Sequence, residues 1–404
     1  MSHGNSTSSL VITNEQRHQI DQLREELKPI LTPDLDTELN LYRWIHGWSG
    51  NVKEASQRLR TYIENRRAFH LDHAEFPDRF LTHPIIHKYG TYFSFSLTPE
   101  SINPHDGSVV VVQRMENIDF HRMAKIMTCE NFVALYFVVC ERVFRQILKI
   151  EQETGKKSGL TIIYDLSNFP IWNYVNPNAP IHKIHKLCLH LLQDYYCDML
   201  HKIYIVNAPT MLSIVLEIVK KFLNPMTQEK LVIVPDKQTL LKNIHPSVVP
   251  AYFGGNLKLS EDYLEKYAQL GLKLNPETCA LIPRQVTDAD HFTAKIFPIP
   301  TVIEHLKPKQ KFEVELKAGK IASKLHWQFH VNSEVQFGII RLQENGQRTL
   351  VFPRLVLNTP KLPEEGHLVC DHAPATYILE FYNCSTSWFS LKLEYAAYVD
   401  DTIA

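Results

Sequence analysis

The sequence of 404 residues predicts a helical N-terminal module, then an α/β domain with a mostly parallel sheet, and finally an all-β sandwich. Three changes in the spacing of apolar residues indicate this order. Helical spacing comes first, short apolar segments alternating with long helical ones follow, and strict two-residue alternation ends the chain. The length suffices for two or three domains, each with a core of its own.

Composition and charge limit the classes of function. The chain carries 43 Lys and Arg against 44 Asp and Glu, so we expect no nucleic-acid partner. Residues 1–10 are polar and serine-rich, lack the apolar stretch of a signal peptide, and predict a disordered tail. No apolar run reaches the ~18 residues that a membrane-spanning helix needs. Seven cysteines without a CxxC pair suit a reducing compartment, which predicts a cytoplasmic protein.

Residues 11–76 have the spacing of amphipathic helices. Asn14 is expected to cap the first helix, which places Ile20, Leu23 and Leu27 on one apolar face. The segment 52–69 predicts a second amphipathic helix with a basic polar face. The N-terminal module should therefore bury its apolar stripes against the domain that follows.

Residues 77–257 alternate short apolar strands with long helices. The strands are expected at 109–112, 160–164, 203–206 and 231–234, and the two long helices at 124–152 and 179–200. The strands lack polar alternation, which is typical of strands covered on both faces of a parallel sheet. The helices are long enough for the crossovers that parallel strands require.

A connector with several prolines, residues 258–290, precedes the change to two-residue periodicity and carries one expected helix at 261–270. In residues 291–404 apolar side chains alternate with polar ones, which predicts antiparallel strands packed as a sandwich. Five aromatic side chains are expected to form its separate core: Trp327, Phe329, Phe337, Phe381 and Phe389. This region should fold as an independent unit.

The helix expected from Pro209 to Leu223 has more apolar surface than one sheet contact can cover. Its polar side chains occupy one stripe about 100° wide. The apolar remainder includes Met211, Leu212, Val215, Leu216, Val219 and Phe222. This surplus requires a second apolar body, which could be a neighbouring helix, a ligand cavity or a membrane.

The sequence offers no constellation for catalysis or for a bound metal. It lacks the GxGxxG and P-loop nucleotide signatures, the GxSxG elbow and the HExxH zinc motif. The lysine pair 156–157 is expected in a solvated loop. The spacing of His182, His185 and His190 with Cys188 is weak for a metal site, and these side chains are expected on a wet helix face. Asp165 follows a predicted strand and should cap a turn rather than act in catalysis. We therefore expect a non-enzymatic protein without metal or cofactor.

Several motifs, in their order along the chain, resemble the CRAL-TRIO lipid-binding family. They are Leu-Thr-Ile-Ile-Tyr-Asp-Leu (160–166), Gln-Asp-Tyr-Tyr (193–196), Ile-Tyr-Ile-Val-Asn-Ala-Pro (203–209), Lys-Phe-Leu-Asn-Pro (221–225) and residues 249–255. Further on, Leu-His-Trp-Gln-Phe (325–329) and the segments 335–339 and 375–381 resemble a GOLD (Golgi dynamics) β-sandwich. This combination is similar to the animal phosphatidylinositol-transfer-like group that includes supernatant protein factor.

The resemblance implies a non-enzymatic carrier for one lipid. In that family the helix after Asn-Ala-Pro is a gate that closes an apolar pocket and opens at a membrane. It assigns this gate and pocket lining to Met211, Leu212, Val215, Leu216, Val219 and Phe222. The expected function is the binding and transfer of a phospholipid or another lipophile between membranes.

A second reading of the resemblance is a lipid-sensing adaptor whose GOLD-like domain binds a trafficking or signalling protein. Either protein would work in the cytoplasm and visit membranes transiently, with the Golgi and endosomes as examples. Phosphatidylinositol, phosphatidylcholine, tocopherol and squalene all remain open as ligands.

The resemblance also names candidates for contact with a lipid headgroup. Phosphoinositide-binding members use an Arg in the N-terminal helices, a Glu after Tyr-Pro, and a Thr and a Lys after the gate helix. Thr227 and Lys230 match this pattern, and Asp198 stands at the Glu position. Trp48 stands at the Arg position and cannot supply a bidentate phosphate contact. Inositol lipid is therefore one hypothesis, with Asp198, Thr227 and Lys230 as its candidate residues.

Overall fold

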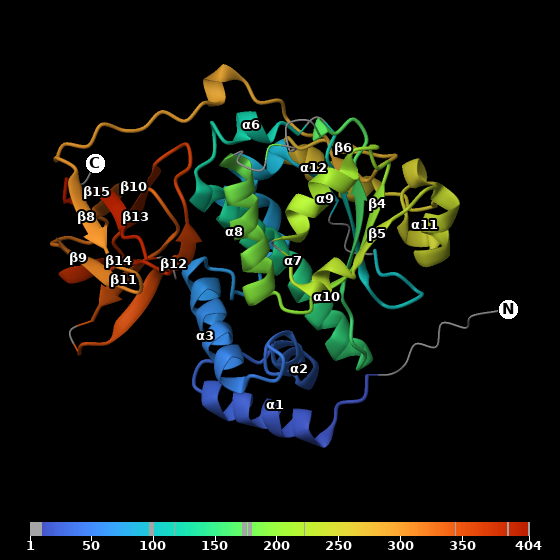
Figure 1. Cartoon of the computed structure of the whole chain (residues 1–404), viewed down its shortest axis with the longest axis horizontal. Helices are drawn as coiled ribbons and strands as arrows, with labels where there is room; N and C mark the ends of the chain where they lie inside the picture. Colours follow the sequence, from blue (N-terminus) through green and yellow to red (C-terminus); the bar gives the residue numbers. More distant parts are fainter. Residues whose placement is uncertain are drawn as a thin grey trace.

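The computed structural model describes residues 10–96, 101–116, 118–171, 176, 180–221, 223–343, 345–385 and 388–402. Figure 1 shows the three parts that the sequence predicts: helices α1 to α3 below, an α/β domain on the right, and a β-sandwich on the left. The N-terminal helices are α1 (Asn14–Leu27), α2 (Glu38–Gly47) and α3 (Val52–Ala68). The expected cap at Asn14 is wrong: Thr13 caps α1, because its hydroxyl accepts from the amide of Gln16, whose side chain accepts in return from Thr13.

The α/β domain is built on a five-stranded sheet in the order β1-β2-β3-β4-β5. The strands are β1 (Ser94–Phe95), β2 (Val109–Arg114), β3 (Leu160–Asp165), β4 (Leu200–Val206) and β5 (Leu231–Ile233). Strands β2 to β5 are parallel and β1 is antiparallel, which confirms the mostly parallel sheet.

The helices of this domain are α4 (Phe76–Arg79), α5 (Pro84–Tyr89), α6 (Phe120–Met123), α7 (Cys129–Thr154), α8 (Pro180–Tyr195), α9 (Leu212–Lys220), α10 (Pro225–Gln228) and α11 (Lys237–Asn243). Helix α8 ends five residues before the expected position. Asp198 adopts a positive φ of 50° in the turn that follows, and β4 begins at Leu200. A left-handed residue cannot continue a right-handed helix.

The two faces of the sheet meet different neighbours. Val112, Ile163 and Tyr204 are adjacent in register and belong to a core that includes Leu240 of α11. Along β3, Ile162 and Tyr164 stand on either side of Ile163 and face the opposite side of the sheet, because side chains alternate along a strand. Figure 1 shows α7, α8 and α9 on that other side. The chain therefore encloses one sheet face in a solid core and leaves the other to three helices.

The segment after the sheet contains α12 (Glu261–Gln269), β6 (Leu274–Asn275) and β7 (Ala280–Leu281). It packs on the α/β domain, since the Ser94 hydroxyl donates to the carbonyl of Leu281 at 2.7 Å. Residues 291–301 then run as an arm to the sandwich (Figure 1).

The C-terminal region consists of two four-stranded antiparallel sheets, ordered β13-β10-β15-β8 and β12-β11-β14-β9. The strands are β8 (Val302–Leu306), β9 (Lys311–Ala318), β10 (Lys324–Val331), β11 (Val335–Leu342), β12 (Arg348–Leu357), β13 (Glu364–Val369), β14 (Ala375–Tyr382) and β15 (Leu391–Asp400). The predicted sandwich is thereby confirmed. Trp327, Phe329, Phe337 and Phe381 are buried in it as expected. The placement of Phe389 in this core is wrong, because β15 begins only at Leu391 and Phe389 is exposed.

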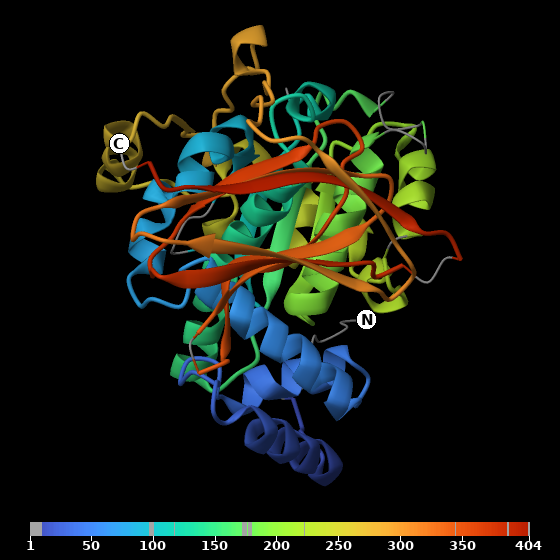
Figure 2. The same cartoon turned by 90° about the vertical axis from the view of Figure 1, so that its left-hand side faces the viewer.

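The sandwich is fixed to the rest of the molecule by polar contacts. The Asn65 side chain on α3 donates to the carbonyl of Arg354 on β12 at 3.0 Å and accepts from its amide at 2.7 Å. On the neighbouring side, Lys186 of α8 lies 2.7 Å from the Glu334 carboxylate. Figure 2 shows the sandwich lying across these helices. The amide of Asn65 thus pairs with the open edge of β12 as a neighbouring strand would.

One contact between the two parts involves a buried carboxyl group. Glu364 of β13 is fully buried, and its Oε1 accepts from the backbone amide of Glu130 in the first turn of α7 at 3.0 Å. Burial, and then the neighbouring carboxylate of Glu130, raise the pKa of Glu364 to about 8. The folded protein therefore holds a proton there that the unfolded chain releases near pH ~4.3.

This buried group predicts a loss of stability with rising pH. Between about pH 4.3 and pH 8 the folded state binds more protons than the unfolded state, so the free energy of unfolding should fall across that window. Glu364→Gln keeps an acceptor oxygen but cannot ionise, so its stabilising effect should grow by roughly 1.4 kcal/mol for each pH unit above the unfolded pKa and be much larger at pH 8 than at pH 5. Urea unfolding at pH 5 and pH 8 measures this. An equal effect of the substitution at both pH values would contradict the prediction.

Candidate functional site

A cavity of about 400 Å³ lies between the sheet and helices α7, α8 and α9. Its floor is the sheet face that carries Val111, Ile162 and Ile203. Side chains from α7 and α8 form its walls, among them Leu135, Val139, Val143, Leu189 and Leu192. The lining is predominantly apolar, so the space suits a hydrophobic ligand.

Helix α9 closes one side of this cavity. Leu212 and Val215 are buried, Leu216 is half-buried, and all three line the cavity. Ser213 and Ile214 are exposed on the outer face. For the side chains that the structure describes, the second apolar body that this helix requires is therefore a cavity rather than another helix.

The other three gate candidates are not among the described side chains that line the cavity. Met211 precedes α9 and packs, half-buried, against the hydrophobic core. Val219 belongs to α9, but its side chain is outside the described part of the structure. Phe222 also lies outside the described residues.

Helix α8 turns polar side chains toward the cavity. His182 and Cys188 are buried, and His182 and His185 line the cavity. The expected wet helix face is therefore wrong for these residues, because this side of α8 packs toward α7. Burial lowers the pKa of His185 to about 4, so its ring is neutral at pH 7. Within the described ranges, no three His, Cys, Asp or Glu side chains are placed to hold a metal ion.

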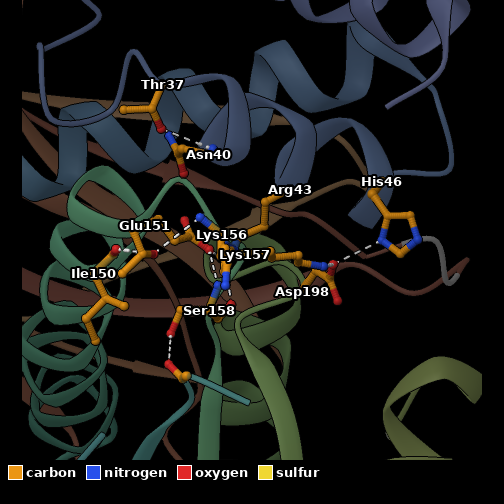
Figure 3. Close-up of polar contacts among 12 residues, drawn as sticks. Thr37, Asn40, Arg43, His46, Ile150, Glu151, Lys156, Lys157, Ser158 and Asp198 are labelled. Atoms are coloured by element: carbon orange, nitrogen blue, oxygen red, sulfur yellow. Dashed lines mark hydrogen bonds and ion pairs between the residues drawn. The ribbon is translucent and has the colours of Figure 1, made fainter. Parts of the chain in front are cut away.

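At one end of the cavity Asp198 lies beside the side chains of Lys157 and His46 (Figure 3). Its Oδ1 accepts from Lys230 Nζ at 3.1 Å, its Oδ2 lies 3.2 Å from His46 Nδ1, and Lys157 also pairs with it. Burial alone would raise the pKa of Asp198, but the bond to His46 and the charges of Lys157 and Lys230 hold it below its usual range. Gly47 allows α2 to come this close, since a Cβ there would lie 2.5 Å from Cys197 Cβ.

The expectation that Lys157 is solvated is thus wrong. Behind it, Arg43 of α2 is fully buried and donates from Nη2 to Glu151 Oε1 at 2.6 Å and to the carbonyl of Ser158 at 3.0 Å. The amide of Ser158 also donates to Glu151 Oε1 at 2.8 Å. These bonds fix the segment that carries Lys157 (Figure 3). Sequence reasoning missed this pair, although an Arg among the buried positions of α2 is the signal that indicates it.

Thr227 and Trp48 complete the comparison with the expected headgroup residues. Thr227 lines the same end of the cavity, and its backbone amide donates to Asn224 Oδ1 at 2.8 Å. Trp48 instead packs beneath Arg58, whose guanidinium carbon lies 5.0 Å from the ring centroid. Arg58 in turn pairs with Asp194 at 2.9 Å. The cations at this end therefore come from Lys157 and Lys230 rather than from the Trp48 position.

A smaller polar recess of about 210 Å³ adjoins this end of the cavity. The two spaces share Asp198, Met199, Leu200 and Lys230. The apolar cavity and the polar recess are therefore neighbours, and the residues between them include the charged side chains of Asp198 and Lys230.

The Asn-Ala-Pro corner before α9 is held by Asp165, the last residue of β3. Asn207 adopts a φ of 52°, and its side chain donates to Asp165 Oδ1 at 2.8 Å. Asp165 also accepts from the Ser167 amide at 3.0 Å and pairs with Arg114. The expected turn cap at Asp165 is confirmed, and it fixes the start of the segment that leads into α9.

Comparison with known proteins places this architecture. Residues 104–255 match the CRAL/TRIO domain. The chain contains a CRAL/TRIO domain. A CRAL-TRIO domain-containing protein of Caenorhabditis elegans is 29% identical over 96% of this chain and 97% of its own length. The nematode protein ctg-1 is 23% identical over 92% of this chain and 94% of its length. The Sec14 cytosolic factor of Schizosaccharomyces pombe is 24% identical over 61% of this chain and 84% of its length.

The two nematode relatives match this chain beyond the CRAL/TRIO domain, through the N-terminal helices and the sandwich. In the part of the chain that the structure describes, we find no helix with the length and apolarity needed to cross a bilayer.

Proposed function

We propose that this chain binds one hydrophobic lipid in its CRAL/TRIO cavity and transfers it between membranes without catalysis. The observation that carries this proposal is the apolar cavity of about 400 Å³ closed by α9. Each CH₂ group buried there contributes ~0.8 kcal/mol, so one acyl chain can offset the cost of leaving a bilayer. The match to the CRAL/TRIO domain supports the proposal.

In this proposal the gate is α9 together with the residues that flank it, and its apolar side chains are Met211, Leu212, Val215, Leu216, Val219 and Phe222. The gate closes in water, where its apolar side chains are buried against the cavity, and opens at a membrane, where the same side chains contact the bilayer. The protein works in the cytoplasm, as the name of the fission-yeast relative, a cytosolic factor, suggests for that protein. It contacts membranes only transiently, while lipid enters or leaves the cavity. We propose the following division of the chain: a tail (1–10), a helical N-terminal module (11–76), the lipid-binding domain (77–257), a connector (258–290) and the β-sandwich (291–404).

Native mass spectrometry of the full chain, followed by organic extraction, tests the proposal. We expect one lipophilic molecule per protein and movement of labelled phospholipid between donor and acceptor vesicles. Folded protein that contains no lipid and takes none from vesicles would overturn it.

The charged end of the cavity suits a headgroup with a phosphate and hydroxyl groups. Lys230 supplies a cation, Thr227 a hydroxyl group, and the Asp198 carboxylate can accept from headgroup hydroxyls. Phosphatidylinositol combines these features, whereas phosphatidylcholine brings its own cation toward Lys157 and Lys230. We therefore propose an inositol lipid as the favoured ligand.

Lys230→Ala should weaken phosphatidylinositol binding by roughly ten- to a hundredfold, because a charge-assisted bond to phosphate is worth roughly 1.5 to 3 kcal/mol. Phosphatidylcholine binding should change little. Lys221→Ala, which removes an exposed lysine outside the cavity, is the matched control. Competition between the two labelled lipids measures the ratio. An unchanged ratio in Lys230→Ala would discard the inositol hypothesis.

A further inference from the structure

The loop between β14 and β15 exposes two adjacent aromatic side chains. Trp388 is 97% exposed and Phe389 is 83% exposed. Aromatic side chains of this size dominate the energy of interfaces when they are buried. Neither contributes to the core of the sandwich, so the folded chain gains nothing from their size.

A basic turn lies directly beside this loop. The β8–β9 turn is joined to the loop by backbone bonds from Lys309 to the carbonyl of Asn383 (2.9 Å) and from Asn383 to that of Gln310 (3.0 Å). Lys309 Nζ also donates to the carbonyl of Cys384 at 3.0 Å. Lys307 and Lys309 are both exposed, and in the described residues neither pairs with a carboxylate. We call Lys307, Lys309, Trp388 and Phe389 the aromatic–lysine corner.

The corner is connected to the wall of the cavity. Cys384 lies 4.0 Å from the carbonyl of Glu334, and the Glu334 carboxylate pairs with Lys186 on α8. Helix α8 lines the cavity with the side chains of His185 and Leu189. In Figure 2 the red end of the sandwich that carries this loop projects to the right, toward the side on which the yellow-green helices lie.

We propose that the aromatic–lysine corner docks the protein on an anionic lipid bilayer. Trp and Phe enter the interfacial layer of a bilayer readily, because it accepts an apolar ring without a preformed pocket. Lysines beside them are attracted to acidic headgroups. A protein partner would need a complementary pocket for a nearly fully exposed tip, whereas a bilayer needs none. Charge and shape together therefore favour a membrane as the occupant.

This docking goes beyond the proposed lipid transfer, since it assigns a membrane contact to the sandwich rather than to α9. Docking at the corner would also orient the cavity relative to the bilayer. The ion pair between Glu334 and Lys186 links the sandwich to α8, so docking at the corner would bring the cavity wall toward the bilayer.

Sedimentation of the full chain with phosphatidylcholine vesicles, with and without phosphatidylserine, tests the proposal. Trp388→Ser with Phe389→Ser should reduce binding to the mixed vesicles by roughly ten- to a hundredfold, from the apolar area withdrawn from water. Lys307→Ala with Lys309→Ala should reduce vesicle binding only when phosphatidylserine is present. Added salt should weaken the binding of the unaltered chain to the same vesicles, because it screens the lysines from the acidic headgroups. Ile321→Ser, which alters another exposed side chain of the same sandwich, should leave binding unchanged.

Thermal unfolding and lipid extraction on the same variants separate this proposal from the transfer function. Loss of vesicle binding by the aromatic double variant, with unfolding temperature and extracted lipid unchanged, supports membrane docking. If the aromatic double variant binds vesicles as well as the unaltered chain does, the docking proposal is overturned. That is the result expected if the corner binds a protein partner instead of a membrane. Wild-type protein that docks as expected but contains no lipid and takes none from vesicles would refute the transfer function and leave the docking proposal standing.

Discussion

Charged side chains on the inner face of α9 are expected to empty the cavity. Val215→Asp combined with Leu216→Asp should leave purified protein without lipid and abolish transfer between vesicles. Both side chains line the cavity, and a carboxylate there faces apolar groups in the closed state and acyl chains in the open one. Desolvating two carboxylates costs several kcal/mol, which removes a large part of what a buried acyl chain returns at ~0.8 kcal/mol for each CH₂ group.

Ser213→Asp is the matched control, because it adds a charge to the same helix on its exposed outer face. Lipid content by mass spectrometry and thermal unfolding should be recorded for all variants. A folded double variant without lipid supports the cavity as the binding site. A double variant that retains its full lipid content would contradict it, and a collapsed unfolding temperature would show that α9 is chiefly a packing element.

Arg43→Met is expected to destabilise the protein by about 3 to 5 kcal/mol, the usual cost of removing one partner from a buried ion pair. Arg43 and Glu151 are almost completely inaccessible to solvent. Burial already raises the pKa of Glu151, and Arg43 opposes that effect. Without Arg43 the carboxylate must either take up a proton or remain buried without its cation.

The double substitution Arg43→Met with Glu151→Met separates the charge from the packing. It should recover much of the lost stability. Two apolar side chains of similar length then replace two charged groups, each of which had to lose its hydration to be buried. Urea unfolding of the single and double variants measures the coupling. If Arg43→Met alone is as stable as the unaltered chain, the pair does not hold the segment 155–158 in place.

The strands and most helices could be predicted because they depend on local pattern. The uniform apolarity of 160–164 is enough to indicate a strand covered on both faces, and β3 is found there. Phe389 shows the limit of that reasoning. It continues the alternation of Leu391 and Leu393, yet it lies before β15 and is exposed. Periodicity does not state where a strand begins.

The candidate site was accessible to sequence reasoning only in part. Thr227 and Lys230 follow α9 closely and could be found by motif, and both line the cavity. Lys157 reaches Asp198 across 41 positions, and Arg43 reaches Glu151 across 108. Such pairs depend on how helices and loops approach one another, which local sequence does not specify.

The sequence by itself determined the order of helices and strands and the excess of apolar surface on α9, because both are periodic properties of neighbouring residues. The tertiary structure decided what that surface covers. Packing α7 and α8 against one face of the sheet, while α11 fills the other, leaves the cavity that α9 closes. It also brought Lys157, Lys230 and His46 around Asp198, since electrostatic pairing depends on distance in space rather than along the chain.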